Sequence, residues 1–168
     1  MEAQLIRNVA FTAAVRKATG SMKNFELGKE VRRAWHDVIA AVEREGLEWN
    51  EKDVGYVFIP QWVTEPVDEL ELLVGVKIDS MDRIPADVQI LKVPARTYVS
   101  VPARGDRDQI MRAYAVIEEW IGRGGYIKDT EEGVYGMEPN RLSPDNPFDI
   151  PADRINRFDF DIMIAIKE

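Results

Sequence analysis

The chain has 168 residues, no cysteine and a formal net charge of −8, and 45% of its residues are hydrophobic. This is the composition of a globular protein with a substantial core, and it excludes disulfides, thiol nucleophiles and thiolate metal sites. The negative charge argues against direct nucleic-acid binding, and the absence of a signal peptide or a membrane-spanning apolar run predicts a cytoplasmic protein.

The first half predicts a strand, a helix and two further strands. Residues 4–16 alternate imperfectly between apolar and polar side chains, as a strand does. In residues 24–45 the apolar side chains step by three and four, which predicts a helix that ends at Gly46. Residues 54–60 form a short apolar run that ends at a proline, and residues 70–78 alternate cleanly, so both are expected to be strands.

The second half predicts the same order of elements. Residues 88–101 are expected to form a strand with a kink or edge at Pro94, which lacks a backbone donor. Asp106 or a neighbour is expected to cap a helix whose apolar side chains again step by four and three. Residues 132–138 and 158–167 predict the two closing strands.

The order of elements is matched by a repetition of the sequence itself. Related pieces are residues 4–10 and 89–95, Gly20 and Gly105, Trp35 and Trp120, Tyr56 and Tyr135, and residues 70–78 and 158–166. Two copies are too few for a solenoid, so one domain built from two pseudo-repeats, about residues 1–80 and 86–168, is expected. The helices should cover one face of a shared sheet, with a ligand site between the halves.

A long connection interrupts the second repeat between Glu138 and Arg157. It holds Pro139, Pro144, Pro147 and Pro151. Loops of this length inside a compact domain are usually functional. Because this loop follows a strand, it is expected to act as a lid.

Four segments carry a further signal: Ile84–Pro85, Val93–Val99, the helix segment Tyr114–Ile121 and the final strand Phe158–Ile164. Their order along the chain resembles that of the gyrase-inhibitor-like family. This family is also known as the effector-binding domain of AraC-type and multidrug-sensing transcription regulators. The resemblance covers essentially the whole chain. It implies an α+β fold in which duplicated β-α-β-β units form a curved antiparallel sheet, with two helices on one face and a ligand groove between the halves.

The resemblance also implies a function. Ligands of the family are typically flat, lipophilic and often cationic, stacked on aromatic rings and faced by a buried acid, commonly a glutamate. The chain is therefore expected to be a sensor or sequestering protein for such a molecule, without a cofactor. No DNA-binding helices precede residue 4, so a stand-alone domain that does not itself contact nucleic acid is expected.

The acids on the final strands are the first candidates to face the ligand. Asp161, Asp159 and Glu71 lie on the strand parity opposite the core, which a solvated sheet face would also explain. The same parity carries Met163 and other apolar residues, and a purely solvated face would be polar throughout. An acid with apolar neighbours is suited to a lipophilic cation, so Asp161 is the first choice.

Glu138 is the alternative acid. A bland interpretation is a strand-terminal acid before a turn. The functional interpretation is an acid at the mouth of the groove, which would pair with a cation or act as a general base if it is buried. Its counterpart in the first half is Ile59, so the acid is not part of the repeated scaffold. A ligand site on a symmetric frame would produce this asymmetry.

Aromatic side chains are expected to provide stacking surfaces in the groove. A cation over such a ring gains about 0.5–2 kcal/mol. Trp35, on the apolar stripe of the first helix, is assigned to the core. The remaining candidates are Tyr56, Tyr98, Tyr114, Tyr135, Trp120 and Trp62. With His36 as the single histidine, a metal site is not expected.

Three functions compete at this point. The first is a small-molecule binding module. The second is a hydrolase of a reactive lipophilic compound, with Glu138 or Asp161 as base and a groove tyrosine such as Tyr135 as acid, since some members of the family have been assigned such activity. The third is inhibition of DNA gyrase as a protein partner, through acidic loop residues such as Asp68 and Asp145.

Overall fold

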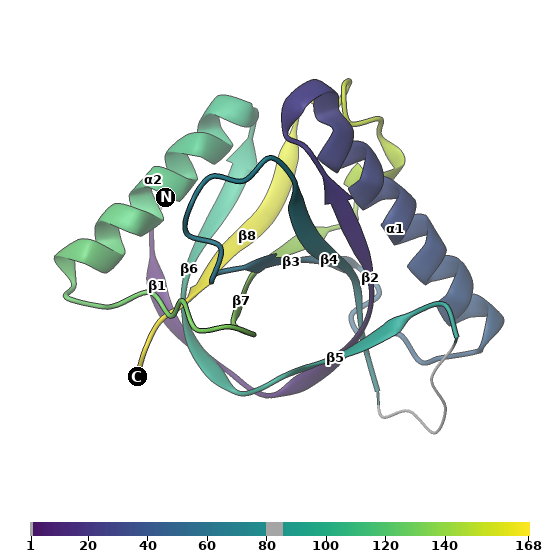
Figure 1. The fold of residues 1–168 in the computed structure, drawn as a ribbon, viewed down its shortest axis with the longest axis horizontal. Helices are drawn as coiled ribbons and strands as arrows, with labels where there is room; N and C mark the ends of the chain where they lie inside the picture. Colours follow the sequence, from purple (N-terminus) through teal and green to yellow (C-terminus); the bar gives the residue numbers. More distant parts are fainter. Residues whose placement is uncertain (1, 80–85) are drawn as a thin grey trace.

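The computed structural model describes residues 2–79 and 86–168, which form one antiparallel sheet with two helices on the same face (Figure 1). The strands are β1 (Gln4–Asn8), β2 (Phe11–Gly20), β3 (Val54–Pro60), β4 (Leu70–Ile78), β5 (Gln89–Val93), β6 (Arg96–Gly105), β7 (Tyr135–Arg141) and β8 (Phe158–Ala165). The helices are α1 (Glu26–Arg44) and α2 (Arg107–Arg123). Within the described residues the strand order is β1-β6-β8-β7-β3-β4-β2-β5. The predicted α+β fold with a curved antiparallel sheet is confirmed.

The two halves of the sheet meet at its centre and exchange strands at its ends. β3 and β7 pair along their whole length, with Val57 opposite Glu138. The predicted single strand over residues 4–16 breaks at Val9 and Ala10, and β1 leaves its own half to pair with β6. In the same way β5 pairs with β2, because the chain turns at Pro94. In Figure 1 these two short strands pass beneath the rest of the sheet, on the side away from the helices.

The remaining boundaries follow the sequence prediction closely. β7 begins at Tyr135, not at residue 132, because Gly133 adopts a positive φ of 92° in a turn where Val134 donates to the carbonyl of Glu131. α1 begins at Glu26 after a short 3₁₀ turn over Lys23–Phe25. The pair Ile84–Pro85, used in the family resemblance, lies outside the described residues.

Helix α2 begins with the predicted cap at Asp106. Its carboxylate accepts a hydrogen bond from the Gln109 backbone N–H at 2.9 Å, and the Gln109 side chain accepts one from the Asp106 N–H at 2.9 Å. This reciprocal pair satisfies two backbone donors that the helix itself leaves unpaired.

Replacing Asp106 with alanine is therefore expected to lower the free energy of unfolding by about 1 kcal/mol. Urea denaturation at neutral pH measures the change. Asp108→Ala is the matched control, because it removes an exposed acid from the first turn of the same helix without removing the cap. Equal losses in both variants would contradict the capping role.

Both faces of the sheet are apolar, for different reasons. Beneath α1 the sheet contributes Leu72, Val74 and Val76, and beneath α2 it contributes Ile162 and Ile164, as the strand parities predict. The sheet curls on the side away from the helices (Figure 1). The opposite parity is therefore also largely buried, in an inner cluster. This inner cluster is formed by Ala13, Val15, Tyr56, Phe58, Leu73, Val93, Tyr98, Val134, Met137, Met163 and Ala165.

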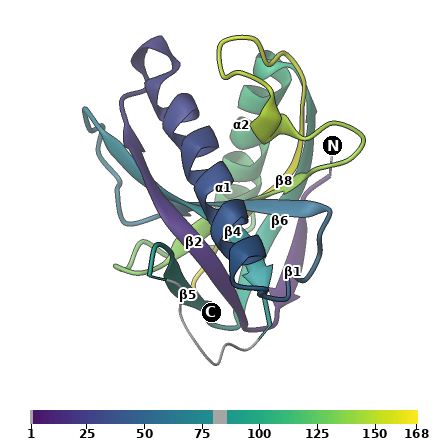
Figure 2. The same ribbon diagram turned by 90° about the vertical axis from the view of Figure 1, so that its right-hand side faces the viewer.

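The connection between β7 and β8 runs past the end of the molecule where both helices begin (Figure 2). Its 3₁₀ turn, Pro147–Asp149, is capped by the Asn146 side chain, which accepts from the Phe148 N–H at 2.9 Å. The Phe148 ring stacks on Trp35 of α1, with ring centroids 4.4 Å apart. No helix in the described residues is long and apolar enough to cross a membrane.

Candidate ligand-binding cavity

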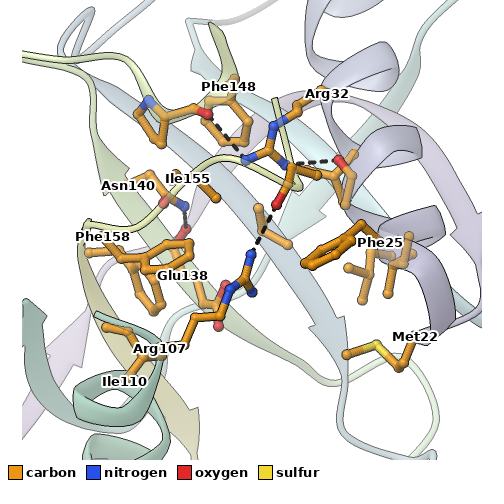
Figure 3. A pocket seen from close by; sticks show the side chains of 18 of the residues that line it. Met22, Phe25, Arg32, Arg107, Ile110, Glu138, Asn140, Phe148, Ile155 and Phe158 are labelled. Carbon is orange, nitrogen blue, oxygen red and sulfur yellow. Dashed lines mark hydrogen bonds between the residues drawn. The ribbon is translucent and has the colours of Figure 1, made fainter. Parts of the chain in front are cut away.

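A cavity of about 480 Å³ opens between α1 and α2, so it lies between the two halves of the repeat (Figure 3). The sheet forms its floor, and the connection between β7 and β8 closes one end. Its volume is within the range of small-molecule sites, and most of its lining is apolar. The lining residues are Ser21, Met22, Phe25, Leu27, Gly28, Val31, Arg32, Val57, Leu72, Arg107, Ile110, Met111, Glu138, Asn140, Pro147, Phe148, Ala152, Ile155, Phe158 and Phe160.

Glu138 places a carboxylate on the floor of this cavity. It is on the central strand pair, directly opposite Val57. The hydroxyl of Tyr114, which projects from α2, donates a hydrogen bond to the Glu138 carboxylate. Glu138 has intermediate solvent exposure, and it borders the cavity.

The electrostatics of this pair follow from its burial. Burial raises the pKa of Glu138 from 4.5 to about 7, although the hydrogen bond from Tyr114 acts in the opposite direction. Burial also raises the pKa of Tyr114 well above its ordinary value, and the negative charge of Glu138 adds to this increase. Tyr114 is therefore a stable donor near neutral pH, whereas Glu138 changes its charge there.

Arg32 fixes the closed end of the cavity. Its guanidinium donates hydrogen bonds to the carbonyl of Ile150, to that of Pro147 at 3.3 Å and to that of Gly28 at 2.9 Å. Two of these carbonyls belong to the connection between β7 and β8, and the third belongs to α1. Arg32 thus joins the connection to α1. The apolar side chains of the connection remain free to line the cavity.

Of the ligand-binding residues predicted from the sequence, Glu138 lies in this cavity and the others are distributed elsewhere. Asp159 and Asp161 face away from the helices and form ion pairs with Arg141, at 2.9 and 2.8 Å. Asp159 also pairs with Arg104 at 2.9 Å. Arginine partners already compensate these carboxylates, so they do not face an apolar cavity.

The predicted aromatic residues are divided between four places. Tyr56 and Tyr98 are buried in the inner cluster together with Met163, and the Tyr56 hydroxyl donates to Glu51 at 3.0 Å. Trp120 stacks on Tyr126, with centroids 5.4 Å apart. The third place is a separate hollow of about 180 Å³ whose lining includes Trp62, Glu71 and Tyr135. Tyr114 is the predicted aromatic residue that meets Glu138.

Sequence reasoning missed Arg32, Arg107, Phe25, Phe148 and Phe158. Charged residues on a helix are usually exposed, so the arginines gave no signal. Phe158 follows the core parity of its strand and Phe148 lies in an irregular connection. The proline-rich character of that connection was the one signal that could have pointed to Phe148.

These observations define a duplicated α+β fold that encloses an apolar cavity with one partly buried acid. Comparisons with solved structures show the same fold. The C-terminal domain of EcmrR is 14% identical, with a TM-score of 0.70, and the match covers 99% of this chain and 98% of that one. SAV2435, solved bound to tetraphenylphosphonium, is 13% identical with a TM-score of 0.63, covering 99% and 94%.

A hydrolase from Listeria innocua also shares the fold, at 9% identity, a TM-score of 0.60 and coverage of 99% and 92%. No protein-family model and no curated protein matches the chain. The solved structures share the fold that the resemblance noted in the sequence implies. Structural matches with sequence identities this low establish a shared fold, and the ligand follows from the residues of the cavity itself.

Proposed function

We propose that the protein binds a lipophilic, positively charged small molecule in the cavity between α1 and α2, with Glu138 as the acid that faces the charge. This would make it a sensor or sequestering domain of the effector-binding type. The observation that carries the proposal is the carboxylate of Glu138 on the floor of a large apolar cavity, where no described basic side chain lies within 4 Å of it.

The chemistry favours a cation because a partly buried carboxylate without a positively charged partner is disfavoured in its charged form. A cationic ligand would supply the missing partner, and its apolar surface would replace water along the cavity walls. Tetraphenylphosphonium, the ion bound to SAV2435, has this combination of charge and apolar surface. It is therefore the first probe for this protein.

The test is calorimetric titration at pH 8 with tetraphenylphosphonium and with tetraphenylborate, which has nearly the same shape and the opposite charge. We expect saturable binding of the phosphonium and much weaker binding of the borate. Glu138→Gln keeps the shape and the hydrogen bond to Tyr114 but removes the charge, and we expect it to weaken phosphonium binding at least about tenfold, as losing a partly buried ion pair does.

Asp161→Asn is the matched control, since it neutralises an acid that faces away from the cavity. Loss of binding in Asp161→Asn with retention in Glu138→Gln would assign the ligand to the other face of the sheet. Equal affinity of wild type for the two probes would refute a charge-selective site.

A hydrolase is the second candidate, and the Tyr114–Glu138 pair favours it. A carboxyl group with a pKa of about 7 is suited to general acid–base catalysis at neutral pH. In this version Tyr114 takes the acid role, because Tyr135 lines the separate hollow. Incubating the protein with reactive lipophilic esters or epoxides and following their consumption by chromatography distinguishes turnover from retention. A rate that Glu138→Gln does not reduce would exclude this mechanism.

A further inference from the structure

Arg107, the first residue of α2, lies at the rim of the cavity, where four parts of the chain converge (Figure 3). Its Nη2 donates to the carbonyl of Ala152 at 3.0 Å. The guanidinium carbon lies 5.2 Å from the ring centroid of Phe25 and 5.3 Å from that of Phe158. Contacts with two rings and one carbonyl hold the guanidinium in place at the rim.

The position of Phe25 shows that this arrangement has a structural cost. Phe25 is the residue that precedes α1, and its backbone is left-handed, with φ of 58°. Non-glycine residues adopt this conformation rarely. The conformation turns the aromatic side chain toward the cavity, where it meets Arg107.

No acid compensates the charge at this rim. Among residues 2–79 and 86–168, no carboxylate lies within 4 Å of Arg107 or Arg32. Repulsion from Arg107 contributes, after burial, to lowering the pKa of Arg32. Both guanidiniums contact the connection between β7 and β8, so they make that side of the cavity electropositive, whereas Glu138 makes the floor negative or neutral.

The two arginines differ in their remaining hydrogen-bonding capacity. Arg32 uses three donors on backbone carbonyls. Arg107 has five N–H donors, and within the described part of the chain one of them donates to the carbonyl of Ala152. Its other donors are available to a planar anion, which guanidinium groups bind in a bidentate manner.

We propose that Arg107 is an anion-binding subsite, and that the cavity takes an amphipathic zwitterion: a lipophilic cation near Glu138 that also carries an acidic group at the rim. This inference rests on the proposed function, because it assigns the ligand's second charge within the same cavity. The competing role for Arg107 is purely structural, namely to hold the carbonyl of Ala152 and the connection between β7 and β8.

Two probes separate these roles. One is a triphenylphosphonium ion with a pentyl chain, and the other is the same ion with a carboxylate at the end of a chain of equal length. By calorimetry at pH 8, we expect the wild type to bind the carboxylate probe about fivefold more tightly, the scale of an ion pair at a solvent-accessible site. Arg107→Gln is expected to abolish this preference, because it should weaken binding of the carboxylate probe more than binding of the pentyl probe.

The matched control is Arg112→Gln, which removes an equal charge from an exposed position of α2 outside the cavity lining. It should retain the fivefold preference. Arg107→Lys keeps the charge without the planar fork, so it should retain part of the preference. Circular dichroism checks that every variant folds.

Each contrary result has a separate meaning. Equal affinity of the wild type for the two probes would overturn the anion subsite and leave the cationic site standing. An equal loss of affinity for both probes in Arg107→Gln would overturn it in favour of the structural role. If neither probe binds the wild type, the proposed function fails, and the subsite fails with it.

Discussion

Glu138→Gln is expected to stabilise the ligand-free protein by about 1–3 kcal/mol at pH 8, although it weakens binding. The pKa of Glu138 lies near 7 in the folded protein, above its ordinary value of 4.5. The folded state thus holds a proton that the unfolded chain releases. Stability that is fully present below pH 4.5 is lost as the pH rises through 7, because the native state must then carry a carboxylate that has no positively charged partner.

The measurement is urea unfolding of the wild type and of Glu138→Gln across this range. The difference between the two should be close to zero at pH 4.5, should grow between pH 4.5 and 7, and should level off above pH 7. Tyr114, which donates to Glu138, stays neutral throughout this range, because burial and the charge of Glu138 raise its pKa well above the ordinary value. The difference therefore isolates Glu138.

A saturating cationic ligand should reverse the order of stability. The ligand binds the ionised form of the wild type and stabilises it by mass action, whereas the glutamine variant gains less. Destabilisation by Glu138→Gln at pH 8 without ligand would show that the carboxylate already has a partner in the free protein. The expected loss of stability in the ligand-free wild type is a cost of function, which is common where a binding site keeps an unfavourable charge.

The local parts of the fold could be predicted from the sequence. The repeat between residues 70–78 and 158–166 identified two equivalent strands, and the parity of their apolar side chains identified the face that the helices cover. Asp106 was correctly expected at the helix start. These features depend on neighbours in the chain or on simple periodicity, which a single sequence displays.

The exchange of β1 and β5 between the halves was not predicted. Residues 4–16 were expected to form one strand, and the structure instead sends Gln4–Asn8 across to β6. Alternation shows that a segment is extended but does not identify its partner. Partners are chosen by long-range packing, here by the curling of the sheet around its inner cluster.

The candidate site was predicted in part, for a related reason. Glu138 breaks the sequence repeat, which distinguishes it from the repeated scaffold, and it lines the cavity. Asp159 and Asp161 were chosen by strand parity, which correctly placed them opposite the helices. Parity could not reveal that Arg141 pairs with both acids, nor that the cavity lies on the helix face.

Phe148 is the aromatic residue that the connection between β7 and β8 contributes to the wall of the cavity. Its ring is almost fully buried and lies nearly parallel to Trp35, at an interplanar angle of 14°. Both rings rest on Gly55 of β3, where a Cβ atom would approach each ring to 2.7 Å. The absence of a side chain at Gly55 therefore allows the rings to pack against the sheet.

Phe148→Ala is accordingly expected to lower the free energy of unfolding by about 3 kcal/mol, at the low end of the range for buried phenylalanine, because one side of the ring already borders an open cavity. The hydrogen bonds from Arg32 and Arg107 still hold the backbone of the connection, so the overall fold should persist. Phosphonium binding should weaken, because the cavity loses part of its apolar wall.

Urea unfolding measures the stability, and calorimetry with tetraphenylphosphonium measures the binding. Phe148→Leu is the control, because it retains most of the apolar volume and should lose about 1 kcal/mol. Trp35 fluorescence should change more in the alanine variant than in the leucine variant, since Trp35 loses its stacking partner. An alanine variant that is destabilised but binds the phosphonium with unchanged affinity would show that the ligand does not contact this wall, and it would move the ligand toward Phe25 and Phe158 at the rim.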